Sequence, residues 1–570
     1  MRAGRIDGAA VRSQGAGGKP FAISAAALIV AAMCSSAHAM GIESGHEDVS
    51  IRWDNTLRYN AGWRVEGIND DFANSATYDE TETTFDKGDM VLNRIDVISE
   101  FDLVYKARHG FRVSASAWYD QAYDDKRPRV SPALEGTGSY VDDEYSAYTK
   151  RYHEGLSGEL LDAFLFTGFD VGSTSVSVKA GQHTVFWGDS LFTTFHNIAY
   201  SQAPLDGLKA ASSPGITAKE VFRPVNQISM LVQPTPELVI AAQYFLEWEP
   251  NRLPQGGTYF GATDVLWEGA ERLFLGYNEG TPLFAYQTNA VEPTHGAGNN
   301  YGVALRWSPF WLNGTAGLYF RQFDEVQAWG PVLGIDSSSF APTDYHLAYA
   351  EDTRLVGLSL NKDVGGVSLG SELSYRHDTA LASASSFAAA GDFEGVEGAR
   401  GDSLHFLVNG IYLMPKTPLW VGGTLQGELV YSHLLDVTKN EDLYKGEGYA
   451  GCPEGQDKSD GCTTDDVVLA QVGFRPEWSQ VLPFGGNLAA PTSFAYGIYG
   501  NGATLGGGNE GVYNWSVGLE ATFRARYVVS LKYNDQHADY TAVNGVVSTA
   551  SGGAVQNNHG WVSLAFQTTF

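Results

Sequence analysis

Gly188-Asp189-Ser190-Leu191 is the first stretch of the chain whose residue types and spacing could do chemistry. Gly-Asp-Ser-Leu is the name-giving motif of a large class of esterases and lipases, in which the serine is the nucleophile. Such an enzyme also needs Gly and Asn donors for the oxyanion and a late Asp-x-x-His that supplies the base. Its serine follows a strand and opens a helix.

The residues around Ser190 do not meet these requirements. The segment after it, 191–207, is polar and aromatic without the pattern of an amphipathic helix. A Gly-x-Asn-Asp, Gly67–Asp70, precedes the serine instead of following it, and Asp535–His537 is one residue too short for the base motif. The tetrapeptide also recurs at Gly401–Leu404, within a strand pattern. We therefore expect no enzyme, and an esterase using Ser190, with His183 or His196, remains the least favoured alternative.

The N-terminus predicts export. Four basic residues precede or flank an apolar run, Phe21–Met33, that is too short to span a membrane as a mature helix. Ala37-His38-Ala39 follows as an A-x-A cleavage site. We expect residues 1–39 to be a secretory signal peptide cut between Ala39 and Met40, and residues 40–570 to form a single domain.

Charge and cysteine content narrow the function classes. A net charge of −29 argues against binding to nucleic acid and against a polybasic anchor on a membrane surface. Of the three cysteines, Cys34 belongs to the signal peptide, and Cys452 and Cys462 lie in one loop sequence, GCPEGQDKSDGC. An isolated cysteine pair in an exported chain predicts one disulfide. The sequence predicts no cofactor and no metal site.

Period-two alternation is the dominant pattern after residue 39. Apolar residues alternate along 49–63, 95–105 and 111–119, and the opposite faces carry charged and polar groups, among them Arg94, Asp96, Glu100 and Arg112. One face suits lipid and the other suits water. No apolar run approaches the ~20 residues that a spanning helix needs.

Short turns alternate with long polar segments along the chain. The short turns include those near Gly110, Gly172, Pro236, Gly314 and Gly366. The long segments run approximately over Glu66–Asp89, Gln121–Gly158, Trp248–Asn299, Asp324–Ala350 and Asp436–Thr464. This asymmetry is typical of a bacterial outer-membrane barrel, with tight periplasmic turns and long extracellular loops. We predict an all-β, antiparallel transmembrane barrel of about 18 strands, with 16 as the alternative, because Pro and Gly interrupt the strand between Leu482 and Tyr499.

The last residues support the same architecture. Val562, Leu564, Phe566 and Phe570 share one face of the final strand, and Phe570 is the last residue. This ending is similar to the terminal strand that the outer-membrane assembly machinery recognises, although Thr568 stands where an aromatic residue is commoner. The predicted location is therefore the outer membrane of a Gram-negative bacterium.

Residues 180–192, AGQHTVFWGDSLF, carry a family resemblance. They resemble the GRQ-x-V-x-WG[ED]S-x-F segment of the Gram-negative outer-membrane family catalogued as domain of unknown function 1302. Two departures are His183 and the absence of a proline after His377-Asp378. Further matching segments are Asn197-Ile198, Ala203–Asp206, Pro214-Gly215, Lys219-Glu220, Tyr244-Phe245 with Trp248, Glu351-Asp352, Gly357–Ser359, Glu372–Arg376, Gly427–Leu429, and the pair Cys452 and Cys462.

The resemblance implies a role rather than a reaction. The Asp in the WG[ED]S segment is replaceable by Glu in the family, which argues against a serine-hydrolase motif. Members look like barrels that take part in passage of hydrophobic compounds, such as steroids, terpenoids and aromatics, across the outer membrane. They often accompany a periplasmic lipoprotein-carrier-like protein and an inner-membrane transporter of the resistance-nodulation-division type. A barrel with only a structural or surface-interaction role is the alternative.

The candidate site residues come from the loops and from the predicted lumen face. We expect Trp187 at the membrane interface or the barrel mouth, and Asp189 and Ser190 in local hydrogen bonds that hold the start of a loop. Long loops over 186–222 and 248–299 are expected to form an aromatic-lined site for an apolar ligand. The lumen candidates are Arg94, Asp96, Glu100, Arg112, Glu372 and Arg376, for which a structural network is favoured over solute selection. The aromatic candidates are Trp187, Phe192, Phe195, Tyr200, Phe222, Trp248, Tyr259, Phe260, Trp267, Phe274 and Tyr277.

Three acidic stretches are predicted to be solvated. Asp70-Asp71, Asp79–Glu82 and Asp142–Glu144 could bind divalent cations together with lipopolysaccharide, but their spacing matches no defined calcium loop. Solvated loop charge is therefore the expectation for all three. The expected partners are outer-membrane lipid, lipopolysaccharide and the assembly machinery.

Overall fold

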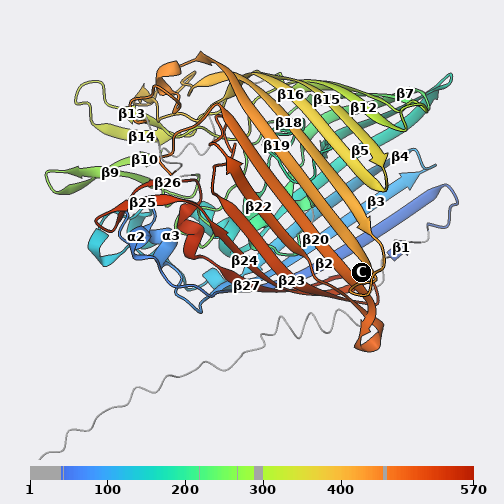
Figure 1. The fold of residues 1–570 in the computed structure, drawn as a ribbon, viewed down its shortest axis with the longest axis horizontal. Coiled ribbons are helices and arrows are strands. Elements are labelled where there is room, and N and C mark those ends of the chain that lie inside the picture. The colour runs from blue at the N-terminus through green and yellow to red at the C-terminus, as the bar shows by residue number, and fades with distance from the viewer. Residues whose placement is uncertain (1–39, 43, 217, 266, 288–298, 453–458) are drawn as a thin grey trace, which may run out of the picture.

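A closed antiparallel β-barrel makes up most of the chain (Figure 1). The computed structural model describes residues 40–42, 44–216, 218–265, 267–287, 299–452 and 459–570. The predicted signal peptide, residues 1–39, lies outside the described residues. Among the described residues, no helix is both long and apolar enough to cross a membrane.

Eighteen strand positions close the barrel, as the sequence predicted, and the alternative of 16 is wrong. The strands are β2 (Val49–Arg64), β3 (Met90–Tyr105), β4 (His109–Asp120), β5 (Gly155–Val171), β6 (Thr174–His183), β7 (Val225–Thr235), β8 (Leu238–Phe245), β11 (Tyr301–Trp307), β12 (Gly314–Phe323), β15 (Thr353–Val364), β16 (Val367–Ala380), β18 (Arg400–Met414), β19 (Gly422–Lys439), β20 (Asp466–Leu482), β21 with β22 (Gly486–Ala489 and Thr492–Tyr499), β23 (Tyr513–Phe523), β24 (Tyr527–His537) and β27 (Trp561–Thr569). A short strand, β1 (Met40–Ile42), pairs with the start of β2.

The last strand closes the barrel against the first. β27 pairs with β2 from Thr56↔Thr569 to Arg64↔Trp561. The terminal Phe570 continues this pairing, because its backbone N–H donates to Asn55 O at 2.8 Å and its carbonyl accepts from Asn55 N at 2.7 Å. Every barrel strand therefore has two neighbours, which removes the free edges that a membrane does not tolerate.

The strand that was hardest to predict is built from two pieces. β21 and β22 lie one after the other between β20 and β23, and the break falls at Ala490-Pro491. Pro491 has no N–H to donate, so it interrupts the ladder. Its carbonyl accepts from Gly518 N at 2.9 Å, which keeps β23 in place across the break.

Alternation along the strands separates an apolar outer face from a lumen face. In β15, Val356, Leu358 and Leu360 are exposed on the outside, whereas Leu355 and Ser359 are buried. The exposed outer residues of this and other strands form the apolar band that faces lipid in barrels of this kind.

The two ends of the barrel differ as predicted. Short turns connect strands at one end, called the turn end, where the C-terminus also lies (Figure 1). At the other end, called the loop end, long loops form a layer of their own. That layer contains a sheet of β9 (Arg272–Asn278), β10 (Thr281–Gln287), β13 (Val332–Ile335), β14 (Pro342–His346) and β17 (Phe387–Ala389), and a hairpin of β25 (Tyr540–Val543) and β26 (Val546–Ala550).

Helices are short and lie in the loops. They are α2 (Asp70–Ala73), α3 (Asp79–Thr83), α4 (Ala147–Thr149), α5 (Gly207–Ser212) and α6 (Ala218–Val221). One-turn elements of 3₁₀ or π type are η1 (Gln121–Tyr123), η2 (Pro132–Leu134), η3 (Val141–Asp143), η4 (Lys150–Glu154), η5 (Glu441–Leu443), η6 (Pro483–Gly485) and η7 (Ala554–Asn558).

The prediction that Asp79–Glu82 is solvated is wrong. The side chains of α3 are buried against other loops, and Asp264 caps the helix by accepting the N–H groups of Glu80 and Thr81 at 2.9 and 2.7 Å. Glu82 pairs with Arg64 at 2.6 Å. Burial, with the charge of Asp264 nearby, raises the pKa of Asp79 to about 8. Asp142–Glu144, in contrast, are exposed.

The predicted disulfide is present. Cys452 and Cys462 are bonded, with their Cα atoms 5.8 Å apart, in the loop between β19 and β20.

Candidate functional site: a loop folded across the lumen

The loop between β6 and β7, residues 184–224, lies inside the barrel and is called the plug loop. It contains α5 and α6, and it includes the WGDS segment. Its first half contacts lumen-facing residues of β11 to β20, and its second half contacts β2 to β5, as the interactions below show. The loop therefore crosses the lumen from one wall to the other.

Glu372 of β16 binds the backbone of the WGDS segment. Its carboxylate accepts the N–H groups of Asp189 and Ser190, the latter at 2.8 Å, and the N–H of Ile198 at 2.7 Å. The side chain is 3% exposed. One carboxylate thus satisfies three amides that have no partner in a helix or sheet.

Glu428 of β19 does the same for the next three amides. It accepts the N–H groups of Leu191, Phe192 and Thr193 at 2.7, 3.1 and 2.7 Å. Asn409 of β18 completes this contact, because its amide donates to Asp189 O at 2.7 Å and to Glu428 at 3.3 Å.

Two arginines bind the carbonyl groups of the same segment. Arg321 of β12 donates to Ile198 O and Tyr200 O at 3.0 and 2.6 Å. Arg376 of β16 donates to Phe195 O and Asn197 O at 2.8 and 3.2 Å, and its guanidinium lies 3.9 Å from the centre of the Tyr200 ring. Both arginines are fully buried.

These four side chains explain how irregular backbone is stable at the depth of a membrane. Within the hydrocarbon region, non-helical backbone is tolerated only where protein or enclosed water satisfies its polar groups. Here acids of the wall accept the N–H groups and arginines of the wall donate to the C=O groups. Glu372 and Arg376 were predicted to share the lumen face, and both contribute to this network.

The second half of the plug loop is held by ion pairs. Arg58 of β2 binds Glu220 through two hydrogen bonds of 3.1 and 3.0 Å. Lys209 in α5 pairs with Glu159 of β5, and Ser213 Oγ lies 3.4 Å from Asp96. These contacts lie on the wall opposite Glu372.

The other predicted lumen residues form a separate network on β3, β4 and β5. Arg94 and Asp96 pair at 2.9 Å. Arg112 pairs with Glu100 and, at 3.2 Å, with Asp162. The structure therefore does not bring Arg94, Asp96, Glu100 and Arg112 together with Glu372 and Arg376.

Glycines on the wall make room for the plug loop. A Cβ on Gly302 of β11 would lie 2.7 Å from the Trp187 ring, and one on Gly357 of β15 would lie 2.8 Å from Ile198. Gly188 of the WGDS segment has φ +96° and packs on the Glu372 carboxylate, so a side chain there is excluded on both counts.

Trp187 packs inside the barrel, on Gly302 near the loop end of β11, so of the two positions expected from the sequence the membrane interface is wrong. It is 8% exposed and packs with Ile198 and Tyr319. Trp248 lies elsewhere, with its ring 4.9 Å from that of Tyr349.

A cavity of about 390 Å³, called the plug cavity, lies within the folded plug loop. Asn251 and Val326 from two other loops complete its wall, and none of the described residues that line it carries a charge. The predicted loop 186–222 thus forms an aromatic-lined space, whereas Trp248, Tyr259, Phe260, Trp267, Phe274 and Tyr277 are not part of it. Its aromatic lining residues are Phe186, Trp187, Phe192, Phe195, Tyr200 and Phe222.

Ser190 is engaged in structural hydrogen bonds. Its Oγ donates to Thr193 O at 2.9 Å and lies 3.3 Å from Glu428. The two histidines considered as a general base are bonded to other groups. His183 Nε2 lies 2.7 Å from Ser229 Oγ, and His196 Nδ1 lies 3.0 Å from His405 Nδ1. The local bond to Thr193 is of the kind that the sequence predicted for Ser190.

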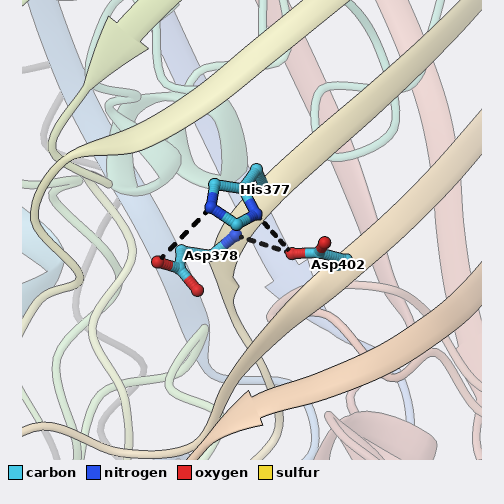
Figure 2. Close-up of side chains that lie close together, drawn as sticks. All are labelled: His377, Asp378 and Asp402. Atoms are coloured by element: carbon cyan, nitrogen blue, oxygen red, sulfur yellow. Dashed lines mark hydrogen bonds and ion pairs between the residues drawn. The ribbon is translucent and has the colours of Figure 1, made fainter.

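A second polar cluster lies at the loop end of β16, β18 and β19 (Figure 2). His377 Nδ1 and Asp402 Oδ1 are 2.8 Å apart, and Tyr375 donates to the other oxygen of Asp402 at 2.6 Å. Thr438 donates to Asp378 at 2.6 Å. The ligand atoms of His377, Asp378 and Asp402 lie within 4.8 Å of one another, a set that could hold a divalent ion. Hydrogen bonds to protein groups account for the same arrangement.

Sequence reasoning missed Glu428, Asn409, Arg321 and Arg58. Alternation could have placed each on the lumen face, because each is a polar residue with an outward-facing apolar residue on at least one side in its strand. These neighbours are Leu429, Val408, Phe320 and Tyr59, and Phe320 shares the outer face of β12 with the exposed Leu318. Their shared role was not visible, because it depends on where an irregular loop lies in three dimensions.

The closed 18-stranded barrel, its apolar outer band and its asymmetric ends define an outer-membrane β-barrel of a Gram-negative bacterium. The chain belongs to the family described as "Protein of unknown function (DUF1302)", whose sequence model matches residues 21–570. This confirms the resemblance found in the sequence.

A search of curated proteins finds no match. Among solved structures, the outer membrane channel DcaP of Acinetobacter baumannii is similar at 10% identity, with 93% of this chain and 99% of that chain covered and a TM-score of 0.37. OccD3 (OpdP) of Pseudomonas aeruginosa is similar at 12% identity, with 94% of this chain and 93% of that chain covered and a TM-score of 0.38. OpdK from Pseudomonas aeruginosa is similar at 10% identity, with 91% of this chain and 98% of that chain covered and a TM-score of 0.39. Values this low transfer no property of those proteins to this chain.

Proposed function

We propose that this barrel is a channel for the passage of hydrophobic small molecules, of steroid, terpenoid or aromatic type, across the outer membrane. The plug cavity would hold the solute in transit. The observation that supports the proposal most is the lining of that cavity, which combines aromatic rings with uncharged polar groups. Apolar ligands favour concave aromatic sites with few polar anchors.

Size and polarity narrow the solute class. A volume of about 390 Å³ falls in the range of small-molecule sites. Ser201, Thr194 and Asn251 are among the polar lining residues, and they could bond a hydroxyl or keto group. A carboxylate would lose its hydration without gaining a cationic partner in the lining, so a neutral solute is favoured.

Binding of two steroids of similar size but different charge tests the proposal. The purified protein in lipid nanodiscs is equilibrated with progesterone or with cholate, and the amount of steroid bound by empty nanodiscs is subtracted. We expect saturable binding of progesterone and weaker binding of cholate. Phe222→Ala, in the cavity wall, should weaken progesterone binding. Phe484→Ala, at an exposed position at the turn end, should not.

Absence of saturable progesterone binding would favour a barrel with a structural or surface role. Preference for cholate would overturn the neutral-solute class. We further propose that the protein is not an enzyme, which predicts that Ser190→Ala leaves any ester hydrolysis in the preparation unchanged.

The proposed partners follow from the location. Lipopolysaccharide and outer-membrane lipid surround the barrel, and the terminal strand ending in Phe570 would be read by the assembly machinery. For a solute that is poorly soluble in water, a periplasmic carrier-like protein and an inner-membrane transporter of the resistance-nodulation-division type would complete the route.

A further inference from the structure

A second, smaller cavity lies between Thr193 of the plug loop and the barrel wall. It measures about 190 Å³ and is called the wall cavity. Residues of β19, β20 and β22 form one side of it, and the loop between β22 and β23 forms another. Ala495, Gly497 and Gly508 are among its lining residues, and both glycines are sites of close packing, Gly497 on Asn509 O and Gly508 on the Leu469 side chain.

The two cavities adjoin at one place in the plug loop, Thr193 with the preceding Phe192, and these two residues are called the partition. Thr193 lines both cavities. Phe192 lines the plug cavity, and its ring reaches the barrel wall, where a Cβ on Gly473 of β20 would lie 3.5 Å from it. Gly473 is two residues along the same face of β20 from Gln471, which lines the wall cavity.

Glu428 fixes the position of this partition. Its carboxylate accepts the N–H groups of both Phe192 and Thr193, at 3.1 and 2.7 Å, and it lines the wall cavity itself. The backbone of the partition is therefore held from the wall side, while the Phe192 side chain rests against a glycine and meets no Cβ there. A side chain on fixed backbone, beside an open wall, can change rotamer without moving the loop.

We propose that Phe192 and Thr193 form a gate between the plug cavity and the wall cavity, and that Glu428 is its positioning residue. The solute would pass from the first cavity to the second when the Phe192 ring turns away from Gly473. This inference rests on the proposed function, because it assigns the route by which a solute in the plug cavity leaves it.

Ion conductance in planar bilayers tests the gate without reference to the solute class. Phe192→Ala removes the ring, and we expect conductance to rise by about threefold or more over wild type. Phe192→Leu should give a smaller rise and serves if the alanine variant does not fold. The matched control is Phe340→Ala, at an exposed position in a loop at the loop end, which should conduct like wild type.

Glu428→Gln tests the positioning role. Glutamine keeps one acceptor oxygen but loses the charge, so we expect a rise in conductance smaller than that of Phe192→Ala. The double variant Phe192→Ala/Glu428→Gln should conduct like Phe192→Ala alone, because both changes open the same partition. A further rise equal to that of Glu428→Gln by itself would overturn the positioning role.

The outcomes separate this inference from the proposed function. Unchanged conductance in both Phe192 variants, together with saturable progesterone binding by the wild-type barrel, would overturn the gate and leave the channel proposal standing. Raised conductance without any progesterone binding would support the gate and overturn the solute class.

Discussion

Glu372 and Glu428 are buried acids whose hydrogen bonds include three backbone N–H groups each, and no cation lies among those partners. A carboxylate in this environment remains stable because charge-assisted hydrogen bonds replace its hydration. The same bonds fix six amides of the plug loop. Two side chains thus decide whether the WGDS segment has a defined conformation.

Changing either acid to its amide should loosen the plug loop and leave the barrel intact. We expect Glu372→Gln or Glu428→Gln to lower the local free energy of opening by about 2 kcal/mol, or about thirtyfold in amide exchange. Hydrogen exchange of peptides from 186–200 measures the change. Asp363→Asn, an exposed acid at the end of β15, is the control. Equal exchange in all three variants would show that these carboxylates do not hold the loop.

Gly302 tests the clearance between wall and plug loop. Gly302→Ala places a methyl group 2.7 Å from the Trp187 ring, and overpacking of this kind costs about 1–3 kcal/mol. We expect faster exchange of amides around Trp187. Gly427→Ala on β19, where the added methyl group meets only one atom, 3.9 Å away, should leave exchange unchanged. If the two variants behave alike, the contact at 302 does not position Trp187.

Residue roles were only partly predictable from the sequence. Alternation placed Glu372 and Arg376 on the lumen face, and the flanks of Ser190 argued against a hydrolase. That Glu372 would bind the backbone of Asp189 and Ser190 was not predictable, because these residues are more than 180 positions apart and meet only when the plug loop enters the barrel.

At the scale of elements, helix α3 shows how burial can reverse the expectation for an acidic stretch. Burial, with the charge of Asp264 nearby, raises the pKa of Asp79 to about 8 and also raises the pKa of Glu80, and burial raises the pKa of Asp264 to about 6. The folded loops therefore bind more protons than the unfolded chain between about pH 4 and pH 8. Their contribution to stability is present at low pH and is lost as pH rises through this range.

Loops 65–89 and 246–271 should consequently loosen as pH rises from about 5 to about 8. Limited proteolysis of the refolded barrel at a series of pH values measures this. Asp79→Asn removes one titrating group, so cleavage should depend less on pH between about 6 and 8. Cleavage that instead increases toward acid would contradict the assigned direction.

Strands were the most predictable elements, because period-two alternation and short turns specify them directly. The break at Ala490-Pro491 made one strand uncertain but did not change the count. Burial of α3 could not be foreseen, because it depends on contacts among loops far apart in the sequence, such as Asp264 with Glu80.

For the whole molecule, the barrel and the plug loop are separable structures. The wall is complete without the loop, since all 18 strand positions pair around the ring and β6 is paired directly with β7. An empty barrel of this size leaves an aqueous channel. The plug loop therefore decides whether the lumen is wide or narrow.

Removal of the plug loop should convert the protein into an open pore. Because His183 and Val225 are register partners, a short Gly-Ser linker can replace residues 184–224 without straining β6 or β7. We expect the variant to fold. Its ion conductance and sugar permeation should lie well above those of the wild type, because water then fills the lumen and the charged residues of the wall face that water. The control is shortening of the β25–β26 hairpin, whose strands pair only with each other in the part of the chain that the structure describes, and it should change neither. Conductance equal to wild type after removal of the plug loop would mean that the external loops close the barrel instead.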